Sequence, residues 1–260
     1  MIPPPRGAER MADREALAEF LSDRVDVHVY ALGDLDEPYW SASAWWRRGD
    51  ALLGIVQLPD GEGVACYGVS TRAPAATCAL IAEAAVHLPV GQLITGPVGL
   101  GAALADVRPV RWARRHQRYV LTDPSALIGV DSSAEALGPG NADELAAVYA
   151  TEPGAGFFLA HMLDGGVFFG IRDRGELVSV AGTHVVSIRH DVAAVGGVFT
   201  VPEYRGRGYA RLLTSAVAST LTTRVATIGL NVMSSNVVAR NIYESLGFTA
   251  VFAYEEAELG

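Results

Sequence analysis

A glycine-rich loop with two arginines has the residue types and spacing that most directly suggest chemistry. It reads Arg205-Gly-Arg-Gly-Tyr-Ala210 and comes shortly after an apolar run that ends at Thr200. The apolar run predicts a strand, and the residues from Tyr209 onward predict a helix. The loop therefore brings backbone amides to a helix N-terminus, where they lack intrahelical partners and the helix dipole favours an anion. These features predict a phosphate-binding loop, here called the phosphate loop.

The side chains of the phosphate loop fit the same function. Gly206 and Gly208 let the backbone turn sharply and approach a ligand closely, and Ala210 is too small to push the ligand away. Positive charge that a pyrophosphate or ribose phosphate can meet comes from three arginines. These are Arg205, Arg207 and Arg211.

Two common nucleotide-binding loops do not fit. A Walker loop requires Lys followed by Ser or Thr, and the chain contains no Lys. A dinucleotide fingerprint requires a third glycine near the start of a domain, but Gly206-Arg-Gly208 is followed by Tyr-Ala-Arg211 and lies late in the chain.

The pattern Arg205-x-x-Gly208-x-Ala210 resembles the phosphate loop of the GNAT superfamily, the acyl-CoA-dependent N-acyltransferases. A second block resembles the strand and helix that follow this loop in the family, with Asn236, Ala239, Tyr243 and Gly247-Phe248 in the family's order. The resemblance covers roughly residues 140–256. It implies a mixed α/β sheet of the GNAT fold and an enzyme that transfers an acetyl group from acetyl-CoA directly to an amine.

The resemblance also implies roles for individual residues. Coenzyme A is expected to contact the main chain of Val198, Phe199 and Thr200, the phosphate loop and Asn236. Within the phosphate loop and the start of the helix, the expected contacts are Arg205, Gly206, Arg207, Gly208, Tyr209, Ala210 and Arg211. Tyr243 stands seven residues after Asn236, on the same helix face, and is expected to protonate the departing thiolate.

The general base is left open. Some family members carry Glu on the strand before the last helix, whereas this chain has Asn231, which cannot accept a proton in that role. Other carboxylates and histidines near the expected acceptor side are candidates, as is a base that acts through water. The candidates are Glu152, His161, His190, Asp191 and Glu203.

Composition limits the class of protein. The chain has 260 residues, a formal net charge of −9 and a pI near 5.1, which argue against general nucleic-acid binding. The two cysteines, Cys66 and Cys78, do not form a disulfide framework, and no histidine or cysteine spacing suggests a metal site. No signal sequence or membrane span is predicted, so a cytoplasmic protein is expected.

Periodicity predicts two tandem halves. Residues 1–10 are expected to be a disordered lead, 11–125 a degenerate GNAT-like domain resembling that of glycine N-acyltransferase-like proteins, 126–139 a linker and 140–260 the catalytic domain. Gly96-Pro-Val-Gly-Leu-Gly101 is a weak candidate for a second phosphate loop, because Pro97 lacks an amide donor.

Individual elements are predicted along both halves. Helices are expected at 12–22, 75–87, 100–106, 143–150, 157–163, 209–222 and 236–246. Strands are expected at 25–31, 51–58, 63–70, 92–95, 107–121 (as one strand or a pair), 167–172, 176–188, 191–200, 226–233 and 248–253, with a turn at Pro59-Asp60-Gly61.

The acceptor remains open at this stage. A small primary amine or amino acid is preferred, and a protein N-terminus or lysine is the enzymatic alternative. A CoA-binding sensor or scaffold without turnover is the alternative from another class of function. The chain is also a possible homodimer, and Trp45 and Trp46 are candidates for a partner interface in the first half.

Overall fold

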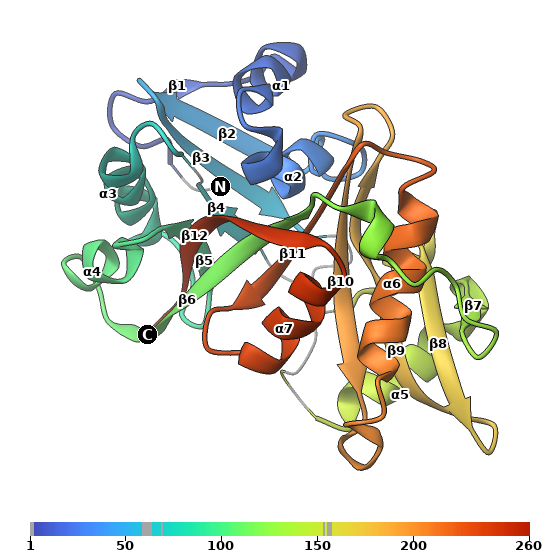
Figure 1. Ribbon diagram of the computed structural model, residues 1–260. Coiled ribbons are helices and arrows are strands. Elements are labelled where there is room, and N and C mark those ends of the chain that lie inside the picture. Colours follow the sequence, from blue (N-terminus) through green and yellow to red (C-terminus); the bar gives the residue numbers. More distant parts are fainter. Residues whose placement is uncertain (1–2, 59–63, 69, 153, 155–157) are drawn as a thin grey trace. The chain divides into compact units, whose positions relative to one another are not determined.

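The computed structural model describes residues 3–58, 64–68, 70–152, 154 and 158–260, which form a mixed α/β structure (Figure 1). Its α-helices are α1 (Arg14–Ser22), α2 (Val25–Gly33), α3 (Pro74–Ala85), α4 (Leu100–Ala105), α5 (Ala142–Ala150), α6 (Tyr209–Leu221) and α7 (Val237–Ser245). Short 3-10 turns lie at Pro124–Ala126, Pro139–Asn141, Ala160–Leu163 and Pro202–Tyr204.

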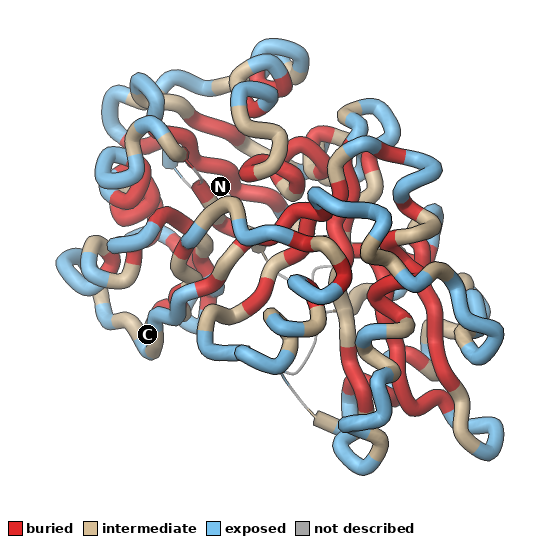
Figure 2. The backbone as a smooth tube through the Cα atoms, in the orientation of Figure 1, coloured by how far each residue is buried: buried red, intermediate tan, exposed pale blue. Residues whose placement is uncertain are grey.

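The strands occur throughout the chain. They are β1 (Glu9–Arg10), β2 (Ser43–Arg48), β3 (Ala51–Gln57), β4 (Val64–Tyr67), β5 (Leu93–Pro97), β6 (Val110–Leu121), β7 (Glu135–Leu137), β8 (Phe168–Asp173), β9 (Glu176–Ser187), β10 (Val192–Thr200), β11 (Thr227–Met233) and β12 (Phe248–Leu259). Figure 2 shows that buried residues follow these strands and that exposed residues concentrate in the connections between elements.

The chain divides into two compact units. The first contains residues 1–118, 233–235 and 251–260, and the second contains 119–232 and 236–250. The units are not consecutive segments, because β6 and β12 each contribute residues to both.

The second unit is a mixed sheet with helices on its two faces. Its strands follow the order β12-β6-β11-β10-β9-β8-β7, in which β10 is parallel to β11 and antiparallel to β9. Residues of α6, α7 and one face of the strands share one buried core, whereas α5 shares another core with Phe168, Val180 and Phe199. The two cores define an α6 face and an α5 face of this sheet.

Helix α6 illustrates how the sequence determines this packing. Leu213, Ala216, Val217 and Leu221 recur at helical spacing and are fully buried. They pack on β-strand residues of the α6 face. The helix begins directly after Gly208, which has a left-handed backbone conformation.

The first unit has its own strand order, β1-β2-β3-β4-β5-β12-β6. Helices α3 and α4 share a buried core with strand residues such as Leu53 and Ile94. Trp45 and Trp46 are buried, with 1% and 5% of their surfaces exposed, so they are core residues and not the partner contacts that the sequence suggested.

Most predicted elements are present, and several are different. The prediction of a strand at 25–31 is wrong, because these residues form α2. The predicted helix at 157–163 is replaced, in its described part, by a 3-10 turn at Ala160–Leu163 that ends before Gly165 and Gly166. Residues 59–61 and 157 lie outside the described residues, so the predicted turn and the predicted start of this helix are not described.

The two ends of the chain also differ from expectation. Glu9 and Arg10, which the sequence assigns to a disordered lead, form β1 and pair with Arg47 and Trp46 of β2. The last strand, predicted to end at residue 253, continues to Leu259 and pairs with β5 from Tyr254 to Glu258.

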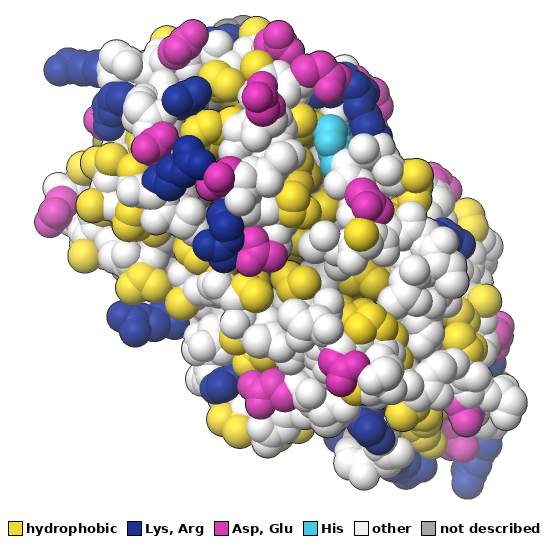
Figure 3. Space-filling view, turned by 45° about the horizontal axis from the view of Figure 1, so that its top comes forward, with side chains coloured by type: hydrophobic (Ala, Val, Ile, Leu, Met, Phe, Trp, Pro, Cys, Tyr) yellow, Lys and Arg dark blue, Asp and Glu magenta, His cyan; other side chains and the backbone are white. Residues whose placement is uncertain are grey.

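Charged side chains of both signs lie near one another on the surface. Figure 3 shows arginines and carboxylates interspersed on the face that it draws. Ion pairs such as Arg172 with Glu135 at 2.7 Å and Arg48 with Glu83 at 2.9 Å account for part of this pattern. Within the described residues, no helix is both long and apolar enough to cross a membrane.

Candidate active site

The phosphate loop connects the end of β10 to the start of α6. After the 3-10 turn at Pro202–Tyr204, Arg205 is extended, and Gly206 and Gly208 have φ angles of +79° and +82°. These angles are costly for residues with a Cβ atom, so both positions require glycine. A Cβ atom built on either glycine would meet no described heavy atom within 4 Å, so the space beside the loop is open.

The amides of this loop are available for an anion. The first backbone hydrogen bond of α6 joins the Leu212 amide to the Gly208 carbonyl at 3.1 Å. None of the amides of residues 206–211 donates to a backbone or side-chain group of another described residue. The arrangement therefore has the donors that a phosphate needs at a helix N-terminus.

The three arginines make different contacts. The Arg205 guanidinium donates from Nε to the Thr200 carbonyl at 3.0 Å, pairs with Glu152 and lies 5.7 Å from the centroid of the Phe199 ring. Arg205 therefore holds the loop against the end of β10.

Arg207 and Arg211 flank the loop. Arg207 lies over the Tyr204 ring at 4.8 Å, and Nε of Arg211 donates to the Ser245 hydroxyl at 3.3 Å. The second contact links the start of α6 to the end of α7.

Strands β10 and β11 pair over only part of their lengths. Their parallel register runs from Val192 with Thr227 to Val195 with Leu230 and then stops, although β10 continues to Thr200. After Val195, this edge of β10 has no partner strand among the described residues. An unpaired strand edge offers backbone donors and acceptors to a ligand.

Two irregularities in the pairing of β9 with β10 lie at the same place. His184 is an extra residue between Thr183 and Val185, which pair with Val195 and Ala194. Beyond the Gly182–Gly196 pair, β10 contains two residues where β9 has one, and Gly197 has a φ of +59°. Such bulges bend a strand and often lie next to active sites.

The predicted pantetheine contacts lie on this unpaired part of β10. Phe199 packs in the core of the α5 face, whereas Val198 packs against the core of the α6 face. The Phe199 carbonyl accepts a hydrogen bond from the Ser179 hydroxyl at 3.1 Å, and Ser179 also pairs with the Thr200 hydroxyl at 2.8 Å. These contacts fix the strand beside the phosphate loop.

Helix α7 carries the other two predicted site residues. Oδ1 of Asn236 caps the helix by accepting from the Ala239 amide at 3.1 Å. Tyr243 is 8% exposed, packs edge-on against Phe248 and belongs to the core of the α6 face. Burial raises the pKa of Tyr243 to about 12, so its hydroxyl keeps a proton at neutral pH.

The structure thus brings most of the predicted site residues together. Val198, Tyr209 and Tyr243 contact the same core, and the loop joins β10 to α6 within it. Asn236 stands at the N-terminus of α7, two helical turns before Tyr243.

The candidate bases are dispersed. Glu152 is engaged by Arg205, and Glu203 is exposed in the turn that precedes the phosphate loop. The Asp191 carboxylate accepts from the Ala226 amide at 2.7 Å. His190 and Asp191 precede β10, whereas Thr200 ends it, so roughly 30 Å of strand separates them at about 3.3 Å per residue. His161 lies in the 3-10 turn at Ala160–Leu163, and Asn231 lies on β11.

Two residues that the sequence analysis did not select also reach the bulge. The Tyr149 hydroxyl of α5 donates to the Gly197 carbonyl at 2.5 Å, and the His184 ring covers Gly196. The signal that could have directed attention to them is Gly196-Gly197 inside a strand, because such glycines mark bulges or close approaches.

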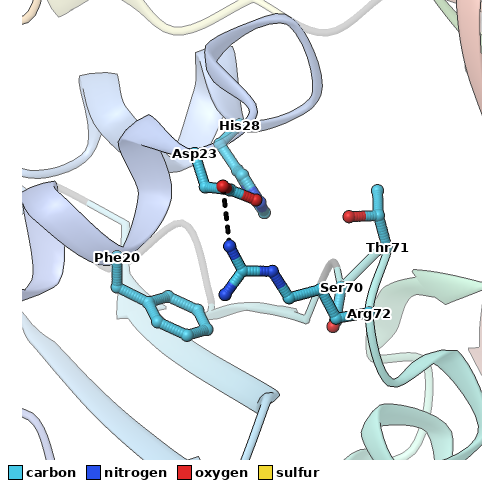
Figure 4. A pocket seen from close by; sticks show the side chains of 6 residues that line it. All are labelled: Phe20, Asp23, His28, Ser70, Thr71 and Arg72. Atoms are coloured by element: carbon cyan, nitrogen blue, oxygen red, sulfur yellow. Dashed lines mark ion pairs between the residues drawn. The ribbon is translucent and has the colours of Figure 1, made fainter.

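The first unit has a loop between strand and helix at the corresponding place in its own order of elements. Arg72 precedes α3, and Figure 4 shows its guanidinium directed at Asp23, at 2.6 Å. Asp50 lies 4.0 Å from the same guanidinium. The positive charge of this loop is therefore already paired with carboxylates.

The Gly96–Gly101 turn is similarly occupied. Pro97 ends β5, and the Gly101 amide in the first turn of α4 donates to the Glu255 carboxylate at 3.0 Å. Burial raises the pKa of both thiols, of Cys66 to about 12 and of Cys78 to about 11, which makes them poor nucleophiles. The described residues contain no group of three His, Cys, Asp or Glu that could hold a metal ion.

Comparisons with known proteins point in one direction. The family model described as FR47-like protein matches residues 168–257, which run from β8 into β12. A comparison with curated proteins gives no significant match. Many solved structures are similar to the chain.

Three of these structures illustrate the likeness. A protein from Novosphingobium aromaticivorans assigned to the acetyltransferases of the GNAT family is 25% identical, with a TM-score of 0.59 over 82% of this chain and 89% of its own. A GCN5-related N-acetyltransferase from Kribbella flavida is 15% identical, with a TM-score of 0.56 over 96% and 97%. A tandem GNAT protein from the clavulanic acid biosynthesis pathway is 16% identical, with a TM-score of 0.53 over 97% and 99%. The predicted mixed α/β fold with two tandem GNAT halves is confirmed.

Proposed function

We propose, from the premise that the chain belongs to the GNAT superfamily of acyltransferases, that it transfers an acetyl group from acetyl-CoA to a primary amine. The proposed acceptor is a small molecule or an amino acid, and the catalytic domain is residues 140–260. One observation carries the proposal: the edge of β10 that is unpaired after Val195 leads directly into a loop whose amides have no partner among the described residues. A long ligand with an anionic end and an amide-containing arm fits this arrangement.

The residues present suit coenzyme A. The amides of residues 206–211 and the flanking arginines would hold the pyrophosphate, since both helix N-termini and guanidinium groups favour phosphate. The backbone of Val198–Thr200 would bind the pantetheine arm as an added strand would bind. Asn236, at the N-terminus of α7, would contact the arm near the sulfur.

In the proposed reaction, the lone pair of the amine attacks the thioester carbonyl carbon. A new C–N bond forms, the C–S bond breaks, and coenzyme A leaves as a thiolate. Tyr243 would donate its hydroxyl proton toward that sulfur, and a base on the acceptor side would take the proton that the amine loses. Placement of both reactants supplies much of the acceleration.

A sensor that binds CoA without turnover is the rival function, because Asn231 occupies the strand position where some relatives of the fold carry Glu. The test is release of CoA thiol when the protein is incubated with acetyl-CoA and pools of amines, amino acids and peptides. The chain has no Lys, so acetylation of its own side-chain amines gives no background. Acceptor-dependent thiol release supports the enzyme, and tight CoA binding without thiol release in any pool supports the sensor.

A further inference from the structure

His184 lies where β10 separates from β11. It is the bulged residue of β9 between Thr183, which pairs with Val195, and Val185, which pairs with Ala194. Val195 is also the last residue of β10 that pairs with β11. The bulge on one side of β10 and the opening on its other side therefore occur at the same residue.

The imidazole of His184 lies against Gly196. A Cβ atom built on Gly196 would stand 2.5 Å from each of three ring atoms, Cγ, Cδ2 and Cε1. Such equal distances mean that the ring lies flat over the Gly196 backbone. His184 is partly exposed, whereas its neighbours Thr183 and Val185 are buried.

The ring lies on the α5 face of the sheet. Gly196 pairs with Gly182, and a Cβ atom on Gly182 would meet the Phe168 ring, which belongs to the core of that face. Directly paired residues share a face, so His184, which covers Gly196, is on the same side as Phe168. Tyr149 of α5 reaches the next residue, Gly197, from this side as well.

Tyr243 belongs to the opposite face. It packs in the α6-face core, together with Val195 and Leu230, the last pair that joins β10 to β11. The opening between these strands thus has an imidazole on one face and a phenol on the other. A thioester held in the opening would present its carbonyl carbon between a group that can accept a proton and a group that can donate one.

We propose that His184 is the general base of the acyl transfer and accepts the proton that the attacking amine loses. This rests on the proposed function. An imidazole nitrogen takes the N–H proton as the C–N bond forms, while the C–S bond breaks and the sulfur receives the proton of Tyr243. The same assignment places the acceptor amine on the α5 face, beside Tyr149 and His184. Imidazole suits the role because its ordinary pKa, about 6.5, leaves it mostly neutral at pH 7.

His184 to Phe separates this role from simple packing. Phenylalanine keeps a flat ring over Gly196 but has no nitrogen to take a proton. We expect unchanged thermal stability and CoA affinity, and a single-turnover rate of acetyl transfer at least ~100-fold below that of the wild type. His190 to Phe is the matched control, because His190 lies before the other end of β10, and it should keep the wild-type rate. A His184 to Phe variant that binds CoA normally and transfers within twofold of the wild type overturns the assignment.

Nitrogen NMR of the imidazoles gives a readout that needs no acceptor. The chain has six histidines, so single His to Phe variants can assign each signal. Addition of acetyl-CoA should shift the His184 signal and leave that of His190 unchanged. Saturation with acetyl-CoA without a response at His184 overturns the proposal even if His184 to Phe does not fold. Failure of the proposed function would instead be seen in the wild type, as absence of transfer to any amine.

Discussion

Tyr243 shows how one residue can be both a core residue and a reactive group. Its ring packs against Phe248 at a centroid distance of 6.3 Å, while burial raises the pKa of its hydroxyl to about 12. A thiol has an ordinary pKa near 8.5, so complete proton transfer from this phenol to a thiolate is uphill. The hydroxyl can still stabilise the developing thiolate by donating a hydrogen bond as the C–S bond breaks.

Substitution of Tyr243 by Phe tests that role. The variant keeps the ring in the core and removes only the hydroxyl, so folding and CoA affinity should change little. The single-turnover rate at saturating acetyl-CoA should fall by ~10- to 1000-fold, since general acid catalysis is typically worth roughly 10²–10⁴-fold and a thiolate is already a fair leaving group. A variant as fast as the wild type would leave Tyr243 as a packing residue only.

Individual residues were predictable where a motif fixed their positions. Asn236 and Tyr243 lie on α7 as the spacing required, and the two loop glycines have the positive φ angles for which glycine was expected. His184 was not predictable in this way. Its position depends on an extra residue in β9, and register irregularities leave no clear signature in one sequence.

At the scale of elements, the phosphate loop and α6 form the unit that would bind the anionic part of the ligand. In the wild type, CoA at a hundredfold excess over its dissociation constant should stabilise the folded protein by about 2.7 kcal/mol. Substitution of Gly208 by Asp should abolish this stabilisation, because the new carboxylate stands where the phosphates bind. The measurement is the CoA-dependent shift in thermal unfolding.

A matched control separates the charge effect from backbone strain. Gly175, in the turn between β8 and β9, has a φ of +90° and open space around it, as Gly208 does. Gly175 to Asp should therefore cost similar stability and keep the full response to CoA. An undiminished CoA response in folded Gly208 to Asp would mean that the ligand binds elsewhere.

A second element-scale feature is the pair between the end of α2 and β4. The Tyr67 hydroxyl donates to the Asp34 carboxylate, and burial raises the pKa of Asp34 to about 7. A carboxyl group whose folded pKa is raised contributes stability that is fully present below pH 3.8 and is lost as pH rises through 7. Substitution by Asn keeps the acceptor for Tyr67 and removes the titration.

We therefore expect Asp34 to Asn to gain stability relative to the wild type by about 3 to 4 kcal/mol between pH 4 and pH 8. His28, whose pKa burial lowers to about 4, works in the opposite direction in both proteins and cancels in the difference. Urea unfolding followed by tryptophan fluorescence suits the measurement, because all four tryptophans lie in the first unit. A difference that stays constant from pH 4 to pH 8 would contradict the raised pKa.

The errors among the predicted elements have physical causes. The stretch Val25-Asp-Val-His-Val29 alternates apolar and polar residues and so predicts a strand, yet it forms α2 with a non-helical His28 in its interior. Burial of Val27, Val29 and Leu32 outweighs that local pattern. The end of β12 was missed because Glu255, Glu256 and Glu258 conceal the buried positions Tyr254, Ala257 and Leu259.

At the scale of the whole molecule, the sequence predicted two tandem GNAT halves but gave no sign of how chain segments are distributed. The first unit includes residues 251–260 from the end of the chain, and β6 enters the second unit at Tyr119. Both strands read as ordinary β segments in the sequence. Which neighbour a strand pairs with depends on contacts between residues that are distant in the chain, and periodicity carries no information on them.

The number of CoA molecules per chain is the prediction that depends on both halves. A phosphate entering the first unit at Arg72 would meet Asp23, at 2.6 Å from that guanidinium, with Asp50 nearby. At the Gly96–Gly101 turn it would have to displace the Glu255 carboxylate from the Gly101 amide. The second unit instead offers the amides of residues 206–211, to which no described residue is bound. Calorimetric titration should therefore give one CoA per chain for the wild type and none for Gly208 to Asp, with Gly175 to Asp again at one. Two sites in the wild type, or one remaining in Gly208 to Asp, would show that the first unit binds CoA despite its paired charges.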